Sequence, residues 1–154
     1  LSHPAISEAS VVGIPDALKG HLPFAFVHLR ADAGAGANTT SNSGGDGDMP
    51  ATVPRALFKE VNTLVREQIG AIASLGGMIQ GRGMIPKTRS GKTLRRVLRA
   101  LVENGVEGRF EEAVNVPPTV EDLSVVDVAR GRVRRFFGEM EMEKRREDGV
   151  KAKL

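Results

Sequence analysis

The segment that most constrains the fold is residues 85–99, IPKTRSGKTLRRVLR, where a proline, a glycine and a helical repeat follow one another. Pro86 fixes its own φ and restricts Ile85 to an extended conformation, so a strand or loop is expected to end there. Gly91 then allows the backbone to turn tightly. Beyond it, apolar residues recur at the spacing of one helix face, namely Leu94, Val97, Leu98, Leu101 and Val102. The segment therefore predicts an extended stretch, a tight turn and an amphipathic helix, in that order.

Lys92 is expected at the start of this helix. Ser90 is predicted to be the N-cap, which places Lys92 at or just before the first turn, where the helix dipole disfavours a cation. Between residues 68 and 102 there are seven Lys or Arg and no Asp or Glu, and the cations around Lys92 are Lys87, Arg89, Arg95 and Arg96. A positive cluster beside a helix N-terminus is suited to a phosphate or carboxylate. A lysine ammonium is also a compact charge that can stabilise two anions approaching each other.

Two other interpretations of this cluster stay open from the residues alone. The first is a solvated basic helix face, which charge alone favours. The second is a stand-alone basic module that binds nucleic acid or acidic partners, since uncompensated cations can follow a phosphate backbone. Aromatic residues make up only 4% of the chain, so base stacking has little support and no nucleic-acid partner is expected.

The composition bounds the class of protein. A chain of 154 residues can build one domain with a real core, made here of aliphatic residues, Met and six Phe, because Trp and Tyr are absent. The absence of Cys excludes disulfides and Cys-ligated zinc, and it fits a reducing compartment. No apolar run reaches membrane-spanning length and no secretory signal is present, so no membrane partner is expected. The first residue is Leu, which leads us to expect a piece of a longer protein.

Three strands and three helices are expected. Residues 6–14 and 23–30 predict an antiparallel pair of strands, the first closed by a turn at 13–16, and residues 75–84 predict a third strand weakened by four glycines. A helix is predicted to begin at Thr52 or Pro54 and to end at Gly70. The helix after Lys92 is followed by a last one from Val120 or Glu121. The predicted fold class is α+β, with a small, mainly antiparallel sheet of about three strands flanked by helices.

Two segments are expected to lie outside the packed domain, which is predicted to span residues 1–137. Residues 31–52 are low in complexity and predict a flexible insertion. Residues 138–154 are charged and predict a frayed tail. The last residues, Ala152-Lys153-Leu154, resemble a C-terminal peroxisomal address, so a cytoplasmic or peroxisomal protein is expected.

The chain carries none of the common self-contained catalytic or nucleotide motifs. His3, His21 and His28 show no metal-ligand spacing, and an isolated histidine is more often structural than a ligand. There is no Gly-x-Ser-x-Gly, no Walker-type loop and no dinucleotide fingerprint. The chain therefore has cations that could contact a nucleotide, but no nucleotide-binding pocket of its own is predicted.

Two blocks of the sequence resemble a known family. HPAISEASVVGIPDALKG at residues 3–20, and LVREQIGAIAS followed by IPKTRSGKTLRRVLR within residues 64–99, resemble the C-terminal domain of AMP-forming acyl-CoA synthetases of the acetyl-CoA synthetase type, in the adenylate-forming superfamily. The resemblance runs from residue 1 to about 137. A further block, VPPTVEDLSVVDVA at residues 116–129, resembles the propionyl-CoA synthetase branch. The glycines at 76, 77, 81 and 83 depart from the family pattern and weaken the strand before the lysine.

This resemblance implies a two-step ligase that uses ATP and coenzyme A as well as a small carboxylate. The chain would be a mobile lid on a larger N-terminal adenylation domain, inactive without it. Lys92 would contact the carboxylate and the α-phosphate during adenylation, and in some relatives this lysine is reversibly acylated. Its supporting loop would be Pro86, Lys87, Thr88, Arg89, Ser90 and Gly91.

The resemblance also implies a second face of the lid. After adenylation the domain would rotate, withdrawing Lys92 and presenting Arg66 to coenzyme A. His3, together with the backbone carbonyls of Leu1 and Ile6, matches a magnesium-binding position of the family. The expected cofactors of the full-length enzyme are therefore ATP, coenzyme A and Mg²⁺.

Overall fold

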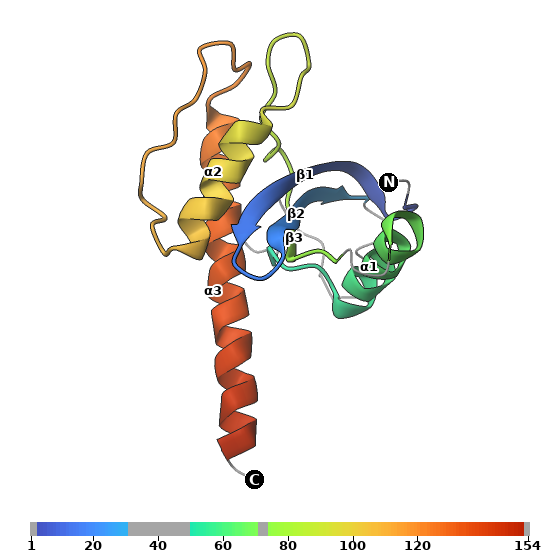
Figure 1. Cartoon of the computed structure of the whole chain (residues 1–154). Helices are drawn as coiled ribbons and strands as arrows, with labels where there is room; N and C mark the ends of the chain where they lie inside the picture. Colours follow the sequence, from blue (N-terminus) through green and yellow to red (C-terminus); the bar gives the residue numbers. More distant parts are fainter. Residues whose placement is uncertain (1–2, 31–49, 71–73, 153–154) are drawn as a thin grey trace, which may run out of the picture.

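The structure is a computed structural model that describes residues 3–30, 50–70 and 74–152. It confirms the predicted α+β class, with a three-stranded sheet between one helix on one face and two on the other (Figure 1). In chain order the elements are β1 (Ile6–Asp16), β2 (Gly20–Leu29), α1 (Arg55–Ile69), β3 (Gly77–Gln80), α2 (Arg95–Val106) and α3 (Ser124–Ala152). Within the described ranges, no helix has the length and apolarity needed to cross a membrane.

The sheet has the order β1-β2-β3 and is mixed. The predicted antiparallel pairing of the first two strands is confirmed, with Val12 opposite Phe24, while β3 joins β2 in parallel, with Phe26 opposite Ile79. The predicted turn at 13–16 was wrong, because β1 continues to Asp16 and pairs with β2 to the end. The Asp16 carboxylate accepts the N–H groups of Leu18 at 2.7 Å and Lys19 at 3.1 Å, which builds the turn after the strand instead.

Strand β3 is shorter than the predicted 75–84, and its glycines have a packing role. A Cβ on Gly76 would lie 2.4 Å from Leu22 Cδ2, and one on Gly77 would lie 2.5 Å from Phe24 Cε1. The backbone of this strand therefore approaches the side chains of β2 more closely than any other residue type allows. The glycines that depart from the family pattern, and that suggested a weak strand, therefore allow β3 to pack against β2.

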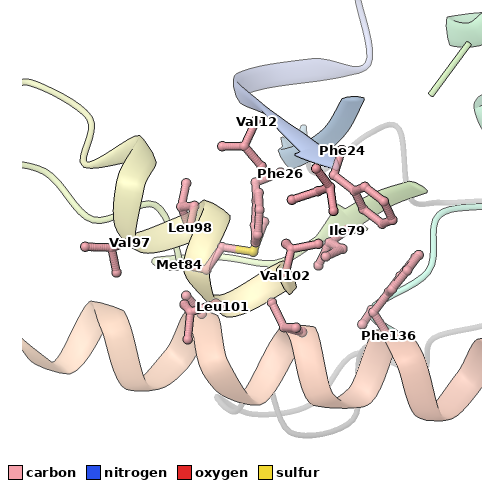
Figure 2. Packing of buried hydrophobic residues seen from close by; sticks show 14 of the residues in the cluster. Val12, Phe24, Phe26, Ile79, Met84, Val97, Leu98, Leu101, Val102 and Phe136 are labelled. Carbon is pink, nitrogen blue, oxygen red and sulfur yellow. The ribbon is translucent and has the colours of Figure 1, made fainter. Parts of the chain in front are cut away.

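Alternation along β2 divides the core into two layers. Phe24 and Phe26 point to the face covered by α2 and α3, while Ala25 and Val27 point to the face covered by α1. Figure 2 shows the first layer, in which Leu98 and its neighbours on α2 fill the space between the sheet and α3. The site residues on α1 and those before α2 are thus carried on opposite faces of one sheet.

The helix boundaries confirm some predictions and correct others. Helix α1 begins after Pro54 and ends before Gly70, as predicted. Helix α2 begins at Arg95 with Leu94 at the N-cap position, so the predicted cap at Ser90 was wrong. Helix α3 begins at Ser124, later than predicted, because Asp122 accepts hydrogen bonds from the Ser124 N–H at 2.9 Å and hydroxyl at 2.6 Å.

The two segments predicted to lie outside the domain differ from expectation where they are described. Residues 31–49 lie outside the described ranges, but Ala51 is fully buried and Thr52 pairs with Ile79, so an insertion reaching residue 52 was too long. The charged segment from 138 continues α3 as helix as far as Ala152, stabilised by pairs such as Arg145 with Glu141 at 2.9 Å. Fraying of this end, and the 1–137 domain limit, stay predictions.

Candidate functional site

Residues 86–93, here called the lysine loop, form a tight hairpin ahead of α2. Lys87 pairs with Thr93, the Thr88 N–H donates to the Lys92 carbonyl at 2.8 Å, and the Gly91 N–H donates to the Thr88 carbonyl at 2.8 Å. This is the pattern of a three-residue hairpin in which a turn is followed by a residue in the left-handed region. Gly91 occupies that position with φ of 87°, which explains why a glycine stands there.

Side chains further stabilise the lysine loop. The Thr88 hydroxyl accepts the Lys92 N–H at 3.1 Å and shares a hydrogen bond with the Ser90 hydroxyl at 2.9 Å. Ser90 is therefore engaged inside the loop, four residues before the N-cap position of α2. Pro86 is buried, and its carbonyl accepts the Leu94 N–H at 2.9 Å. These contacts fix the backbone of Lys92 from both sides.

The cations of the cluster differ in whether they have an ion-pair partner among the described residues. The Lys87 ammonium lies 2.5 Å from the Glu8 carboxylate of β1, so Lys87 ties the lysine loop to the sheet. Lys92 is exposed, and its ammonium forms no ion pair with any residue in the described ranges. The same holds for Arg89, Arg95 and Arg96. The loop thus presents an uncompensated positive surface with Lys92 beside its turn.

A third stretch of chain, residues 117–122, lies against the lysine loop. Val120 pairs with Thr88, the Arg89 N–H donates to the Thr119 carbonyl at 3.2 Å, and the Glu121 N–H donates to the Lys87 carbonyl at 2.9 Å. The only local signal for this was the extended Pro117-Pro118 pair, which predicts a stiff segment but not its neighbour. These contacts were not predicted from the sequence.

Arg66 lies apart from Lys92. It is exposed in the last turn of α1, where a cation is favoured by the helix dipole, and its guanidinium forms no ion pair with the residues the structure describes. Because α1 covers the face of the sheet opposite to α2 and α3, the structure does not bring Arg66 and Lys92 into one site (Figure 1).

The magnesium position predicted at His3 stays a prediction, because Leu1, one of its three members, lies outside the described residues. The ring is buried, with Nδ1 accepting the Ala5 N–H at 3.1 Å and Nε2 lying 3.2 Å from the Glu60 carboxylate. Because Nδ1 already accepts a hydrogen bond, it is not free to bind a cation, while the buried Nε2 has no hydrogen-bond partner among the described residues. Ile6 is described but Leu1 lies outside the described residues. Within the described part of the chain, no group of three or more His, Cys, Asp or Glu is arranged to hold a metal.

Comparison with known proteins shows the family of the chain. A family model described as the AMP-binding enzyme C-terminal domain matches residues 1–92. An acetyl-coenzyme A synthetase of Xylella fastidiosa is 35% identical over 123 residues, which are 80% of this chain and 16% of the relative. One of Pyrobaculum arsenaticum is 34% identical over 140 residues, which are 91% of this chain and 17% of the relative.

A solved structure shares the fold. The acetoacetyl-CoA synthetase from Streptomyces lividans matches 86% of this chain and 16% of its own with a TM-score of 0.54, at 23% sequence identity. The chain spans about one sixth of the length of the curated relatives it matches. It belongs to the family of AMP-binding enzyme C-terminal domains, as these occur in the AMP-forming acyl-CoA synthetases.

Proposed function

We propose that this chain is the C-terminal lid of a short-chain, AMP-forming acyl-CoA synthetase that acts on acetate or propionate. In the first step a carboxylate oxygen attacks the α-phosphorus of ATP, an O–P bond forms and pyrophosphate leaves. In the second step the sulfur of coenzyme A attacks the acyl carbon, a thioester forms and AMP leaves. The partner of the lid is a large N-terminal adenylation domain, without which the chain is inactive.

The observation that carries this proposal is the ammonium of Lys92, which no described residue pairs with, on a hydrogen-bonded hairpin. Adenylation brings two anions together, and their repulsion is reduced by a cation between them. At about 4 Å and an effective dielectric of about 20, one such charge attracts each anion by roughly 4 kcal/mol. Closure of the lid excludes water and strengthens this attraction.

The separation of Lys92 and Arg66 supports a lid that works in two orientations. One orientation of the domain presents one face of the sheet to a site on the larger domain. Lys92 serves the first step in one orientation, and Arg66 serves the phosphates of coenzyme A after the domain has rotated. The Mg²⁺ that accompanies ATP stays assigned to the position formed by His3 and the backbone carbonyls of Leu1 and Ile6, as the family resemblance implies.

The test of the first role is Lys92→Ala in the full-length enzyme that carries this domain. Release of pyrophosphate from ATP with acetate or propionate should fall by about 10²-fold or more, since loss of one well-placed stabilising group typically costs that much. Formation of thioester from supplied acyl-AMP and coenzyme A should be unchanged. Arg99→Ala, which removes a cation one turn into α2 that pairs with Glu103, is the matched control. Equal loss of both steps would contradict the assigned role.

The second role is tested by Arg66→Ala. The KM for coenzyme A should rise about tenfold because one charge-assisted contact is lost, while pyrophosphate release stays the same. Lys59→Ala removes an exposed cation from the same helix and should leave both steps unchanged. An unaltered dependence on coenzyme A would remove Arg66 from the site. The choice of substrate is a separate question, raised by the block at residues 116–129. Comparison of kcat/KM for acetate and propionate would decide it.

The cellular location is a separate part of the proposal. We place the enzyme in the cytoplasm or, through Ala152-Lys153-Leu154, in the peroxisome, although Lys153 and Leu154 lie outside the described residues. A fluorescent protein ending in these three residues should enter peroxisomes if the address is used. Uniform cytoplasmic fluorescence would remove that part of the proposal.

A further inference from the structure

The 117–122 segment connects the end of the α2 region to α3 and lies along one strand of the lysine loop. We propose that this segment positions Lys92, with Glu121 acting as a positioning residue through its backbone N–H. The inference rests on the proposed function, because it concerns the same lysine. It assigns a role in catalysis to the connection before α3.

The hydrogen bonds of the segment lie at the strand of the hairpin opposite Lys92. The Glu121 N–H donates to the Lys87 carbonyl at 2.9 Å, and the Thr119 carbonyl accepts the Arg89 N–H at 3.2 Å. Thr88 lies between these two bonds, and it is Thr88 that holds both the N–H and the carbonyl of Lys92. The segment therefore acts on Lys92 through one intervening residue.

A two-stranded hairpin on its own is only marginally stable in water, and an added strand is what makes such a unit persist. The 117–122 segment supplies that third strand at Val120. The rest of the loop projects beyond the sheet, and Arg89, Ser90, Gly91 and Lys92 are all exposed. Without the segment, the loop would be held by its own turn, by Pro86 and by the Lys87–Glu8 ion pair.

The segment is itself held at both ends, so it can transmit a fixed position. On the near side, Val114 and Val116 pack against the core. On the far side, Asp122 caps α3, and Val126 is buried four residues later. Pro117 and Pro118 restrict the backbone between these ends, which lowers the entropy lost when the segment orders. The position of the lysine loop is thereby linked to the docking of α3.

The contacts of the 117–122 segment fix the backbone of Lys92 and thereby the point from which its long side chain extends. A displacement of about 1 Å at a catalytic group can lower a rate by about a hundredfold. Loosening the third strand should therefore reduce adenylation and leave the second step unchanged, because Lys92 takes no part in thioester formation. A merely structural role of the segment would lower both steps together.

The experiment compares two substitutions at one position in the full-length enzyme. Glu121→Pro removes the N–H that bonds the Lys87 carbonyl, while Glu121→Ala removes the same exposed carboxylate and keeps the N–H. We expect adenylation, followed by pyrophosphate release, to fall at least tenfold in Glu121→Pro and less than twofold in Glu121→Ala. Thioester formation from supplied acyl-AMP should be unchanged in both. Amide exchange at Thr88 and Gly91 should be faster in Glu121→Pro alone.

A second variant covers the case in which Glu121→Pro does not fold. Asp122→Ala removes the cap that holds the far end of the segment and should lower adenylation about threefold, again without changing the second step. Equal adenylation rates in Glu121→Pro and Glu121→Ala would overturn the inference, as would equal loss of both steps. Lys92→Ala in the same assay separates the two ideas, since an active Lys92→Ala enzyme defeats the proposed function whatever the variants at 121 do.

Discussion

Glu139 on α3 stabilises a part of the fold that is remote in sequence. Its carboxylate accepts the N–H of Ala51 at 3.1 Å and the N–H of Thr52 at 2.9 Å. The same short stretch is bonded to the sheet, since Gln80 donates its N–H to the Ala51 carbonyl at 2.8 Å. We expect Glu139→Ala to loosen residues 50–52 from α3 and to lower the free energy of unfolding of the domain.

The size of the loss in unfolding free energy follows from the N–H groups of Ala51 and Thr52, which lose their acceptor. A hydrogen bond to a charged group contributes about 1.5–3 kcal/mol, and a buried donor left without a partner costs about 1–3 kcal/mol. Ala51 is fully buried, but the Glu139 side chain is 25% exposed, so water replaces part of the loss. We therefore expect a loss of about 2 kcal/mol, which for a domain of this size lowers Tm by about 4–8 °C. Glu139→Gln keeps an acceptor oxygen and should lose about half as much.

The pH dependence gives a second signature of the same contact. Burial raises the pKa of Glu139, but hydrogen bonds from the Thr52 N–H, Arg135 and the Ala51 N–H together outweigh it and leave the pKa below its ordinary value of 4.5. A carboxyl whose pKa is depressed in the folded state adds stability above its unfolded pKa, and this stability is lost as the pH falls through the folded pKa. The difference between wild type and Glu139→Ala should therefore be full at pH 7 and shrink below about pH 4.5.

The assay is urea unfolding followed by circular dichroism, at pH 7 and at several acidic values. Glu141→Ala is the matched control, because Glu141 lies on the same helix and pairs only at the surface with Arg145, so its removal should change stability by about 0.5 kcal/mol or less. A Glu139→Ala protein as stable as the control at pH 7 would refute the reasoning. So would a difference that grows as the pH falls.

Three glycines give further predictions. Gly105→Ala should destabilise the chain by about 1–2 kcal/mol in the same urea assay, because the new Cβ would lie 2.6 Å from the Phe137 ring and 2.9 Å from Val133 Cγ1. Gly138→Ala on α3 meets no atom within 4 Å and should instead stabilise by about 0.5–1 kcal/mol, so that a matching sign for the two changes would contradict the packing. Gly91→Ala should cost about 1–2 kcal/mol, since φ is 87° there, and Gly91→Asn should cost less because Asn tolerates the left-handed region; equal losses would argue against the observed turn.

Local pattern was enough to predict the elements that depend on neighbouring residues. The alternation in residues 23–30 predicted a strand paired antiparallel with the first, as observed in β1 and β2. The repeat that begins at Leu94 gave the buried face of α2, and Pro54 and Gly70 marked the ends of α1. The cluster around Lys92 was also visible, because its cations are adjacent in the chain.

Other features were decided by contacts between residues far apart. Gly77 was expected to weaken β3, because Phe24, whose ring lies close to its backbone, is distant in sequence. Sequence pattern also did not reveal that Lys87 pairs with Glu8, while Lys92 has no ion-pair partner in the part of the chain that the structure describes. Local spacing determined which segments became strands, helices and a basic loop. Tertiary packing decided which polar groups found partners, because those partners lie on other elements of the fold.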